Sequence, residues 1–262
     1  MSGIVYLVGA GPGDPRLLTL RGAEVLQRAD VVVYDRLAPA ALLDLAPRGA
    51  EQVDAGKARG QVALSQEEIN RVLVDRGRRG LTVVRLTGGH PFGFGGGGAV
   101  ARALAGARVT FAVVPGVSAA VAAPAYAGIP VTHRGLAASY AVISATLAGG
   151  APADLARTAA AADTLVLLMA AERLREVCTQ LIAAGRPAGE PAAVVASAST
   201  GAQRVVTGTL AELATSEVEV DPPATLVCGP SVALAGSLAW FAPAAPEAGT
   251  AVGENQVSRS AR

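Results

Sequence analysis

Three glycines separated by single residues, Gly9, Gly11 and Gly13, directly follow the apolar run Ile4–Val8. Glycine lets a backbone bend sharply and approach a ligand closely. Pro12 and Pro15 fix the backbone and remove donors, so no helix is expected to begin at once. In α/β proteins an open loop at the carboxyl end of a strand borders the ligand cleft. The spacing therefore predicts that this loop forms one wall of a ligand site.

A dinucleotide is the first ligand to consider for such a loop. Asp35 ends the expected strand Val31–Tyr34, where an acidic residue would bind a ribose hydroxyl. The glycine spacing is not G-x-G-x-x-G, however, and the prolines replace residues whose N–H groups would meet a pyrophosphate. The pattern therefore disfavours a dinucleotide.

A second glycine-rich loop, Gly88–Gly98, follows the expected strand Leu81–Leu86. Neither loop carries the Lys-Ser/Thr pair that binds phosphate. A ligand bound by backbone groups and apolar walls, without phosphate, fits S-adenosylmethionine, which joins adenosine to a charged methionine. The two loops therefore predict a cleft for this methyl donor.

Lys57 is the only lysine among 22 basic residues. A guanidinium does not release its proton, whereas an ammonium does so when its surroundings lower its pKa. Two interpretations stay open for Lys57: a solvated remnant of an arginine-rich composition, or a proton-transfer group. Two also stay open for Asp35: a cap for a short helix over 38–46, or a chemical role.

Composition excludes several classes of function. The net charge is +1 and 3% of residues are aromatic, so neither a basic patch nor a base-stacking surface for nucleic acid is indicated. No apolar run is long enough to span a membrane, and the amino terminus lacks a basic signal region, so a cytoplasmic location is expected. Cys178 and Cys228 have no metal-ligand spacing with His90 or His133, which predicts two buried thiols and no metal.

Alternating strand and helix patterns fill the first part of the chain and predict a mostly parallel sheet covered on both faces. Ser65 and Glu68 form a capping box for a helix that ends at about Arg79. Strands over 192–197 and 203–207 are too close for a helical crossover, so the second sheet is expected to be mixed. The other expected strands are Gln52–Ala55, Val109–Val114, 140–145, 164–169 and 224–228, and the other helices are Leu17–Arg28, 99–106, Val117–Ala127 and 172–184.

The chain is therefore predicted to contain two α/β domains with a cleft between them. The N-terminal domain is expected over residues 1–116 and the C-terminal domain over 117–242, because Pro115-Gly116 interrupts the pattern. Residues 243–262, rich in Ala, Pro, Glu, Gly and Ser, are typical of a disordered tail.

The motifs resemble those of the uroporphyrinogen-III C-methyltransferases, a branch of the tetrapyrrole (precorrin) methylase superfamily. The glycine-proline loop is common to the superfamily, whereas Tyr34-Asp35-Arg36-Leu37 and Gln66-Glu67-Glu68-Ile69-Asn70 are specific to this branch. The resemblance spans about residues 3–235. The further matching segments are Gly56-Lys57, Val84-Arg85-Leu86, Gly88-Gly89, Pro91-Phe92, 114–119, 123–134, 203–210 and 222–224.

This resemblance implies a homodimer that methylates two ring carbons of uroporphyrinogen III and yields precorrin-2, a precursor of sirohaem and cobalamin. S-adenosylmethionine would be the methyl donor and S-adenosylhomocysteine the product. Asp35 would accept a proton and Lys57 would donate one. The residues that would line the cofactor site are Pro12, Gly88, Gly89, His90, Gly93, Ser118, Ala119, Met169 and Ala198.

Two of these positions also have purely structural interpretations. Ser118 could serve only as a helix cap, and Met169 at a strand end is usually a core residue. Arginines suit the carboxylates of the substrate because they bind them in bidentate fashion. Arg36, Arg59 and Arg134 are the weaker candidates for this role.

The second loop departs from the family pattern. His90 stands where an aspartate is expected, Gly93 where an apolar residue is expected, and Gly96 where an arginine is expected. Neutral His90 accepts a hydrogen bond, but a protonated His90 would repel the amino group of the methyl donor. Two alternatives to the full activity therefore stay open: a related precorrin methylase with an altered substrate, or a weakly active or non-catalytic homologue.

Overall fold

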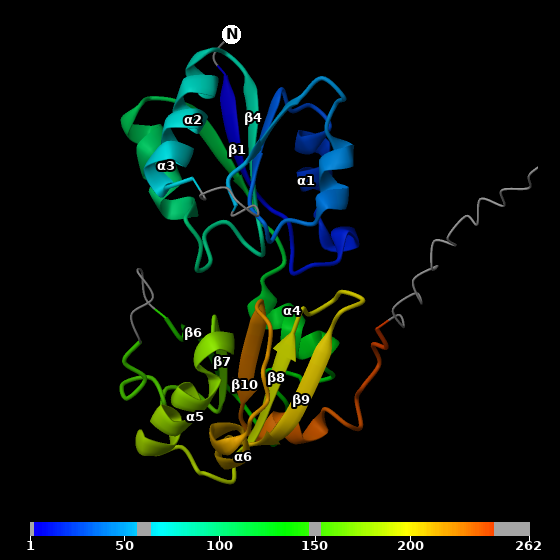
Figure 1. Ribbon diagram of the computed structural model, residues 1–262, viewed down its shortest axis with the longest axis vertical. Coiled ribbons are helices and arrows are strands. Elements are labelled where there is room, and N and C mark those ends of the chain that lie inside the picture. The colour runs from blue at the N-terminus through cyan, green and yellow to red at the C-terminus, as the bar shows by residue number, and fades with distance from the viewer. Residues whose placement is uncertain (1–2, 57–63, 147–152, 244–262) are drawn as a thin grey trace, which may run out of the picture.

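The computed structural model describes residues 3–56, 64–146 and 153–243. Figure 1 shows two α/β units, one above the other, joined by the segment that leads into helix α4 (Ala119–Tyr126). Each unit is built around a five-stranded sheet. The two sheets confirm the fold class that the alternating patterns predict.

The sheet of the N-terminal unit is entirely parallel, as predicted. Strands buried on both faces require apolar residues at nearly every position, which explains their continuous apolar runs. Because all of them run in one direction, their carboxyl ends meet at one edge of the sheet. In the order β3-β2-β4-β1-β5, the strands are β3 (Glu51–Asp54), β2 (Val31–Tyr34), β4 (Thr82–Thr87), β1 (Ile4–Gly9) and β5 (Thr110–Val114).

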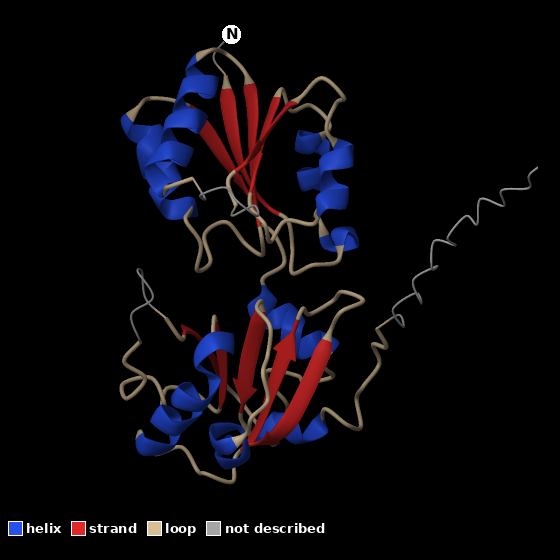
Figure 2. Cartoon of the chain, in the orientation of Figure 1, coloured by secondary structure: helices blue, strands red, loops and turns tan. Residues whose placement is uncertain are grey.

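Helices cover both faces of this sheet, as Figure 2 shows. On one face, α2 (Gln66–Arg78) and α3 (Gly97–Gly106) bury Leu73 and Leu104 against alternate strand residues such as Val5. On the other face, α1 (Leu20–Leu26) and the 3-10 helix η2 (Ala40–Leu45) pack against the intervening residues, including Val32. The capping box of Ser65 and Glu68 is present at the start of α2, as predicted.

The sheet of the C-terminal unit is mixed, which confirms the expectation from its closely spaced strands. Strand β6 pairs in parallel with β7, and the remaining pairs are antiparallel. In the order β6-β7-β10-β8-β9, the strands are β6 (Tyr140–Ser144), β7 (Thr164–Leu168), β10 (Ala224–Cys228), β8 (Pro191–Ala196) and β9 (Arg204–Thr209).

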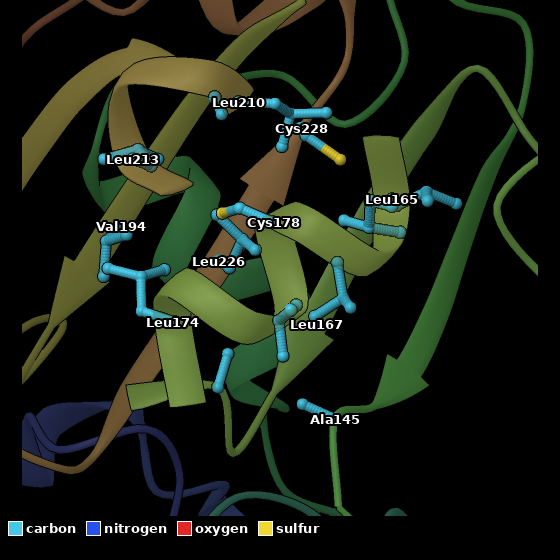
Figure 3. Close-up of a cluster of buried hydrophobic side chains, with 14 of the residues drawn as sticks. Ala145, Leu165, Leu167, Leu174, Cys178, Val194, Leu210, Leu213, Leu226 and Cys228 are labelled. Atoms are coloured by element: carbon cyan, nitrogen blue, oxygen red, sulfur yellow. The ribbon is translucent and has the colours of Figure 1, made fainter. Parts of the chain in front are cut away.

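One face of this sheet is covered by α5 (Leu174–Ala183) and α6 (Leu210–Thr215), and the other by α4. Figure 3 shows Cys178 of α5 and Cys228 of β10 among leucines of the core between the sheet and helices α5 and α6. Both are free, buried thiols, as predicted. Helix α6 is not among the predicted elements, although Thr209 and Glu212 form a capping box at its start.

The segment after the first glycine loop begins differently from the prediction. Pro15 does not delay helical structure, because it occupies the first position of a 3-10 turn, Pro15–Leu17, where no N–H group is needed. The α-helix then begins at Leu20, with the Thr19 side chain accepting a hydrogen bond from the Gly22 N–H. The single helix expected over Leu17–Arg28 is therefore two short elements. The helix expected over 38–46 is likewise present only as the 3-10 helix η2.

Candidate active site

A cavity of about 900 Å³ lies between the two units. The N-terminal unit contributes loops that follow β1, β2 and β4 at the carboxyl edge of its sheet. The C-terminal unit contributes residues that follow β6, β7 and β8 and residues that precede β10. A crevice at the carboxyl ends of parallel strands is the usual ligand position in α/β proteins, and its volume falls within the range of small-molecule sites.

The two glycine-rich loops both line this cavity and contact each other. The Gly89 N–H donates to the Gly11 carbonyl at 2.7 Å, and a short bridge joins the two residues. The approach is too close for a side chain: a Cβ atom on Gly9 would lie 2.4 Å from the Gly89 oxygen. The loops predicted to border one crevice therefore form one continuous surface.

Asp35 lies at the end of β2 with both carboxylate oxygens held. Its Oδ1 atom accepts hydrogen bonds from the backbone N–H groups of Leu37, at 3.1 Å, and Gly88, at 3.4 Å. Its Oδ2 atom accepts one from Nη2 of Arg85 at 3.4 Å. The alternative that Asp35 caps the helix over 38–46 is wrong, since Pro39 occupies the cap position of η2.

Arg85 is a site residue that the sequence analysis did not identify. It belongs to β4, is 8% exposed, and its Nη1 atom donates to the carbonyls of Val33 and Leu86 at 3.2 Å. Burial lowers the pKa of its guanidinium, and the charge of Asp35 acts in the opposite direction. The available signal was one charged residue within the otherwise apolar strand Thr82–Thr87.

All nine residues that the resemblance assigns to the cofactor site line the cavity. They come from five separate segments of the chain, on both sides of the cavity. Pro12 follows β1, four follow β4, two open α4, one follows β7 and one follows β8. They are Pro12, Gly88, Gly89, His90, Gly93, Ser118, Ala119, Met169 and Ala198.

Three of these side chains have informative surroundings. Met169 is 47% exposed and adopts a positive φ of 58°, so it is not the core residue that the alternative required. Ser118 both lines the cavity and caps α4, since its hydroxyl oxygen accepts from the Ala120 N–H at 3.2 Å. His90 accepts a hydrogen bond at Nδ1 from the Phe92 N–H at 3.0 Å. The neutral ring therefore carries its proton on Nε2.

The basic residues predicted to act in the site differ in their position relative to the cavity. Arg36 lines the cavity. Arg134 is exposed and is not among the lining residues. Lys57 and Arg59 lie outside the described residues. Gly56, which precedes Lys57, lies beside Arg36, because a Cβ atom on it would be 2.9 Å from the Arg36 nitrogen.

One buried hydrogen bond crosses from the first glycine loop to the C-terminal unit. The Asp14 N–H donates to the Ser199 hydroxyl at 3.0 Å. Ser199 is in turn held by Gln203, whose Oε1 atom accepts from the Ser199 N–H at 2.8 Å and whose Nε2 atom donates to the Tyr126 carbonyl at 3.0 Å. Side-chain hydrogen bonding from Arg16 lowers the pKa of the Asp14 carboxyl, against an opposing effect of burial. This chain of contacts fixes the loop of Pro12 against the loop of Ala198.

Two further properties of the described residues bear on the site. Within them, no group of three or more His, Cys, Asp or Glu side chains is arranged to hold a metal ion. Over the same residues, no helix has the length and apolar character needed to cross a membrane.

A parallel and a mixed sheet with a cavity between them, bordered by two interlocked glycine loops, define an α/β protein with a small-molecule site. The family model of Tetrapyrrole (Corrin/Porphyrin) Methylases matches residues 4–214. The chain belongs to the tetrapyrrole methylase family.

Three known proteins illustrate the similarity. Siroheme synthase 1 of Halorhodospira halophila is 49% identical over 243 residues, which is 91% of this chain and 50% of that protein. The crystal structure of uroporphyrin-III C-methyl transferase from Thermus thermophilus, complexed with S-adenyl homocysteine, is 44% identical with a TM-score of 0.79, and the match covers 88% of this chain and 99% of that one. A cobalt precorrin-4 methyltransferase is 28% identical with a TM-score of 0.75, covering 87% and 95% of the two chains. The chain thus spans about half the length of the siroheme synthases it matches.

Proposed function

We propose that this protein transfers methyl groups from S-adenosylmethionine to two ring carbons of uroporphyrinogen III and so forms precorrin-2, a precursor of sirohaem and cobalamin. The observation that carries the proposal is the cavity between the two units, which is lined by all nine predicted cofactor residues and by Asp35. The similarity to the Thermus thermophilus structure over almost its whole length supports the same activity.

The lining of the cavity fits the methyl donor. Pro12, Ala119, Met169 and Ala198 supply apolar surface, and the glycine loops bring backbone groups within reach. Adenosine needs apolar walls and a few backbone hydrogen bonds, whereas the charged methionine end needs polar partners. We propose that the nine lining residues hold this molecule. When bound, it supplies an electrophilic methyl group, and S-adenosylhomocysteine is left after transfer.

Asp35 is proposed as the proton acceptor. When a carbon of a pyrrole ring gains a methyl cation, the ring system must lose a proton from another position as its conjugated bonds rearrange. The Asp35 carboxylate is 27% exposed at the cavity, and Arg85, Leu37 and Gly88 donate hydrogen bonds to it. Donors on both oxygens fix the orientation of the carboxylate. The side chain is thus arranged to receive a proton from a ring held in the cavity.

Lys57 is proposed as the proton donor, on the basis of the resemblance and of its position next to Gly56. Arg36, which lines the cavity, is proposed to bind a carboxylate of the substrate, because its guanidinium forms bidentate pairs with carboxylates. Arg59 and Arg134 are weaker proposals for the same task. The remaining rate enhancement is expected from holding the ring carbon, the methyl group and the sulfur atom in line.

We also propose a homodimer, a cytoplasmic location and a domain division after residue 116. The first two come from the resemblance and from the composition. The division is supported by α4, because Ala120 and Ala123 of this helix pack in one core with residues of the C-terminal sheet.

The test is incubation of the purified protein with uroporphyrinogen III and S-adenosylmethionine, followed by absorbance and mass detection of the product. Formation of precorrin-2 is expected. Binding of S-adenosylmethionine without precorrin-2 would overturn the proposal and favour a methylase of another tetrapyrrole or a non-catalytic homologue. A panel of further precorrins then separates these two alternatives.

A further inference from the structure

Gln66 and Asn70 belong to the motif over residues 66–70, to which the proposed function assigns no role. They lie one turn apart at the start of α2, and the Gln66 Nε2 atom donates to Oδ1 of Asn70 at 2.9 Å. Gln66 also lines the interdomain cavity. It does so from the N-terminal unit, and it is not one of the nine residues proposed to hold the methyl donor. Gln66 is therefore available to the other molecule of the proposed reaction, the tetrapyrrole.

The carboxamide of Gln66 lies against Gly96, where the lack of a side chain leaves room for it. A Cβ atom on Gly96 would be 2.3 Å from the Gln66 Oε1 atom. The amide oxygen thus occupies the space where a side chain at position 96 would begin. The family pattern expects an arginine at position 96, and here the Gln66 amide occupies the space where that side chain would begin.

We infer that Gln66 is a substrate-specificity residue whose Oε1 atom accepts a hydrogen bond from a pyrrole N–H group of the tetrapyrrole. The inference rests on the proposed function. Because Nε2 is engaged by Asn70, the oxygen is the atom directed over Gly96. A porphyrinogen has N–H donors at its centre and carboxylates at its rim, and a neutral acceptor complements the donors.

The first test compares Gln66→Met with Gln66→Glu at saturating S-adenosylmethionine. Methionine keeps the length of the side chain but removes the acceptor, so the KM for uroporphyrinogen III is expected to rise about three- to tenfold, the cost of one neutral hydrogen bond. Glutamate keeps an acceptor and is expected to leave KM near the wild-type value. The affinity for S-adenosylmethionine is expected to be unchanged in both. Glu67→Gln is the matched control, since Glu67 is an exposed neighbour outside the cavity lining.

The second test uses Gly96→Ala, whose new methyl group displaces the flexible end of Gln66. Its KM is expected to rise as in Gln66→Met, with no further rise in the double variant. Gly98→Ala is the control, because no atom lies within 4 Å of a Cβ there.

Three results would overturn the inference: an unchanged KM in Gln66→Met, a rise in Gln66→Glu as large as in Gln66→Met, or additive effects of the two sites. A large rise in Gln66→Glu would indicate a contact with a substrate carboxylate instead. If the wild-type protein forms no precorrin-2, the proposed function falls and this inference falls with it. If the wild type is active, these results bear on Gln66 alone.

Discussion

The guanidinium of Arg85 lies behind the carboxylate of Asp35, with Nη2 3.4 Å from Oδ2. The Arg85 side chain is 9% exposed and the Asp35 side chain is 27% exposed, so the carboxylate is the more accessible partner of the pair. Arg85 belongs to β4 and Asp35 directly follows β2, and these two strands pair in parallel. This arrangement makes Arg85 a positioning group for the proposed proton acceptor.

Asp35→Asn is expected to lower turnover by about 10²- to 10⁴-fold, the usual contribution of a positioned acid or base. Asparagine has nearly the same size and retains an oxygen for the Leu37 N–H, but it does not accept the proton. The affinity for S-adenosylmethionine should stay near the wild-type value. Rates of precorrin-2 formation and calorimetric titration measure the two quantities. An unchanged rate would remove Asp35 from the mechanism.

Arg85→Met is expected to lower kcat while leaving the protein folded. Removing one partner of a fully buried ion pair costs about 3–5 kcal/mol, but the loss here should be smaller because the Asp35 side chain is 27% exposed to solvent. Asp35 then loses the donor that orients it. Steady-state kinetics and thermal unfolding are measured on the same samples. Arg204→Met, at an exposed position of β9, is the control. A folded variant with full turnover would show that Asp35 does not depend on Arg85.

Ser199→Ala is expected to weaken both folding and binding of S-adenosylmethionine. The variant leaves the buried Asp14 N–H without its acceptor, which costs about 1–3 kcal/mol. Binding is affected because the contact holds the loop of Pro12 against the loop of Ala198. Urea unfolding and calorimetry provide the readouts, with Ser237→Ala as an exposed control. Equal dissociation constants for variant and wild type would contradict this account of the contact.

Gly97→Ala and Gly98→Ala are expected to change stability in opposite directions. A Cβ on Gly97 would lie 2.1 Å from the Pro91 carbonyl oxygen, whereas a Cβ on Gly98 has no atom within 4 Å. Overpacking against backbone costs about 1–3 kcal/mol, and replacing an unhindered helical glycine by alanine gains about 0.4–1 kcal/mol. Urea midpoints measure both changes. Shifts of the same sign would argue against the described start of α3.

The two thiols make stability depend on pH in alkaline solution. Burial raises the pKa of Cys178 to about 11 and that of Cys228 to about 12, from 9.0. The unfolded chain therefore loses thiol protons at a lower pH than the folded chain, so the free energy of unfolding should fall as pH rises from 9 toward 11. Urea midpoints at these two pH values test the prediction, with Cys228→Ala as a variant of weaker pH dependence. A thiol reagent at pH 8 should react slowly until the protein unfolds; rapid reaction of the native protein would contradict the burial.

Local patterns predicted most elements because each carries its own signal. Val31–Tyr34 is a fully apolar run, and Ser65 with Glu68 marks the start of α2. The predictions that differ from the structure concern residues whose type is compatible with two local conformations. Pro15 predicts an interruption of helical structure, but proline is also well suited to the first position of a helical turn, which is where Pro15 lies.

The sequence by itself predicted where the strands lie and that the loops Gly9–Pro15 and Gly88–Gly98 border one cleft. It also predicted that the ligand of this cleft carries no phosphate. These depend on residue types and short spacings, which act locally. Only the tertiary structure decided that Arg85 supports Asp35, that Ser199 holds the Asp14 loop, and that Gln66 lies over Gly96. Those partners are 50, 185 and 30 positions apart in the printed numbering. Strand pairing and the packing of the two units bring these residues together. A local pattern specifies neither which strands become neighbours nor how one unit packs on the other.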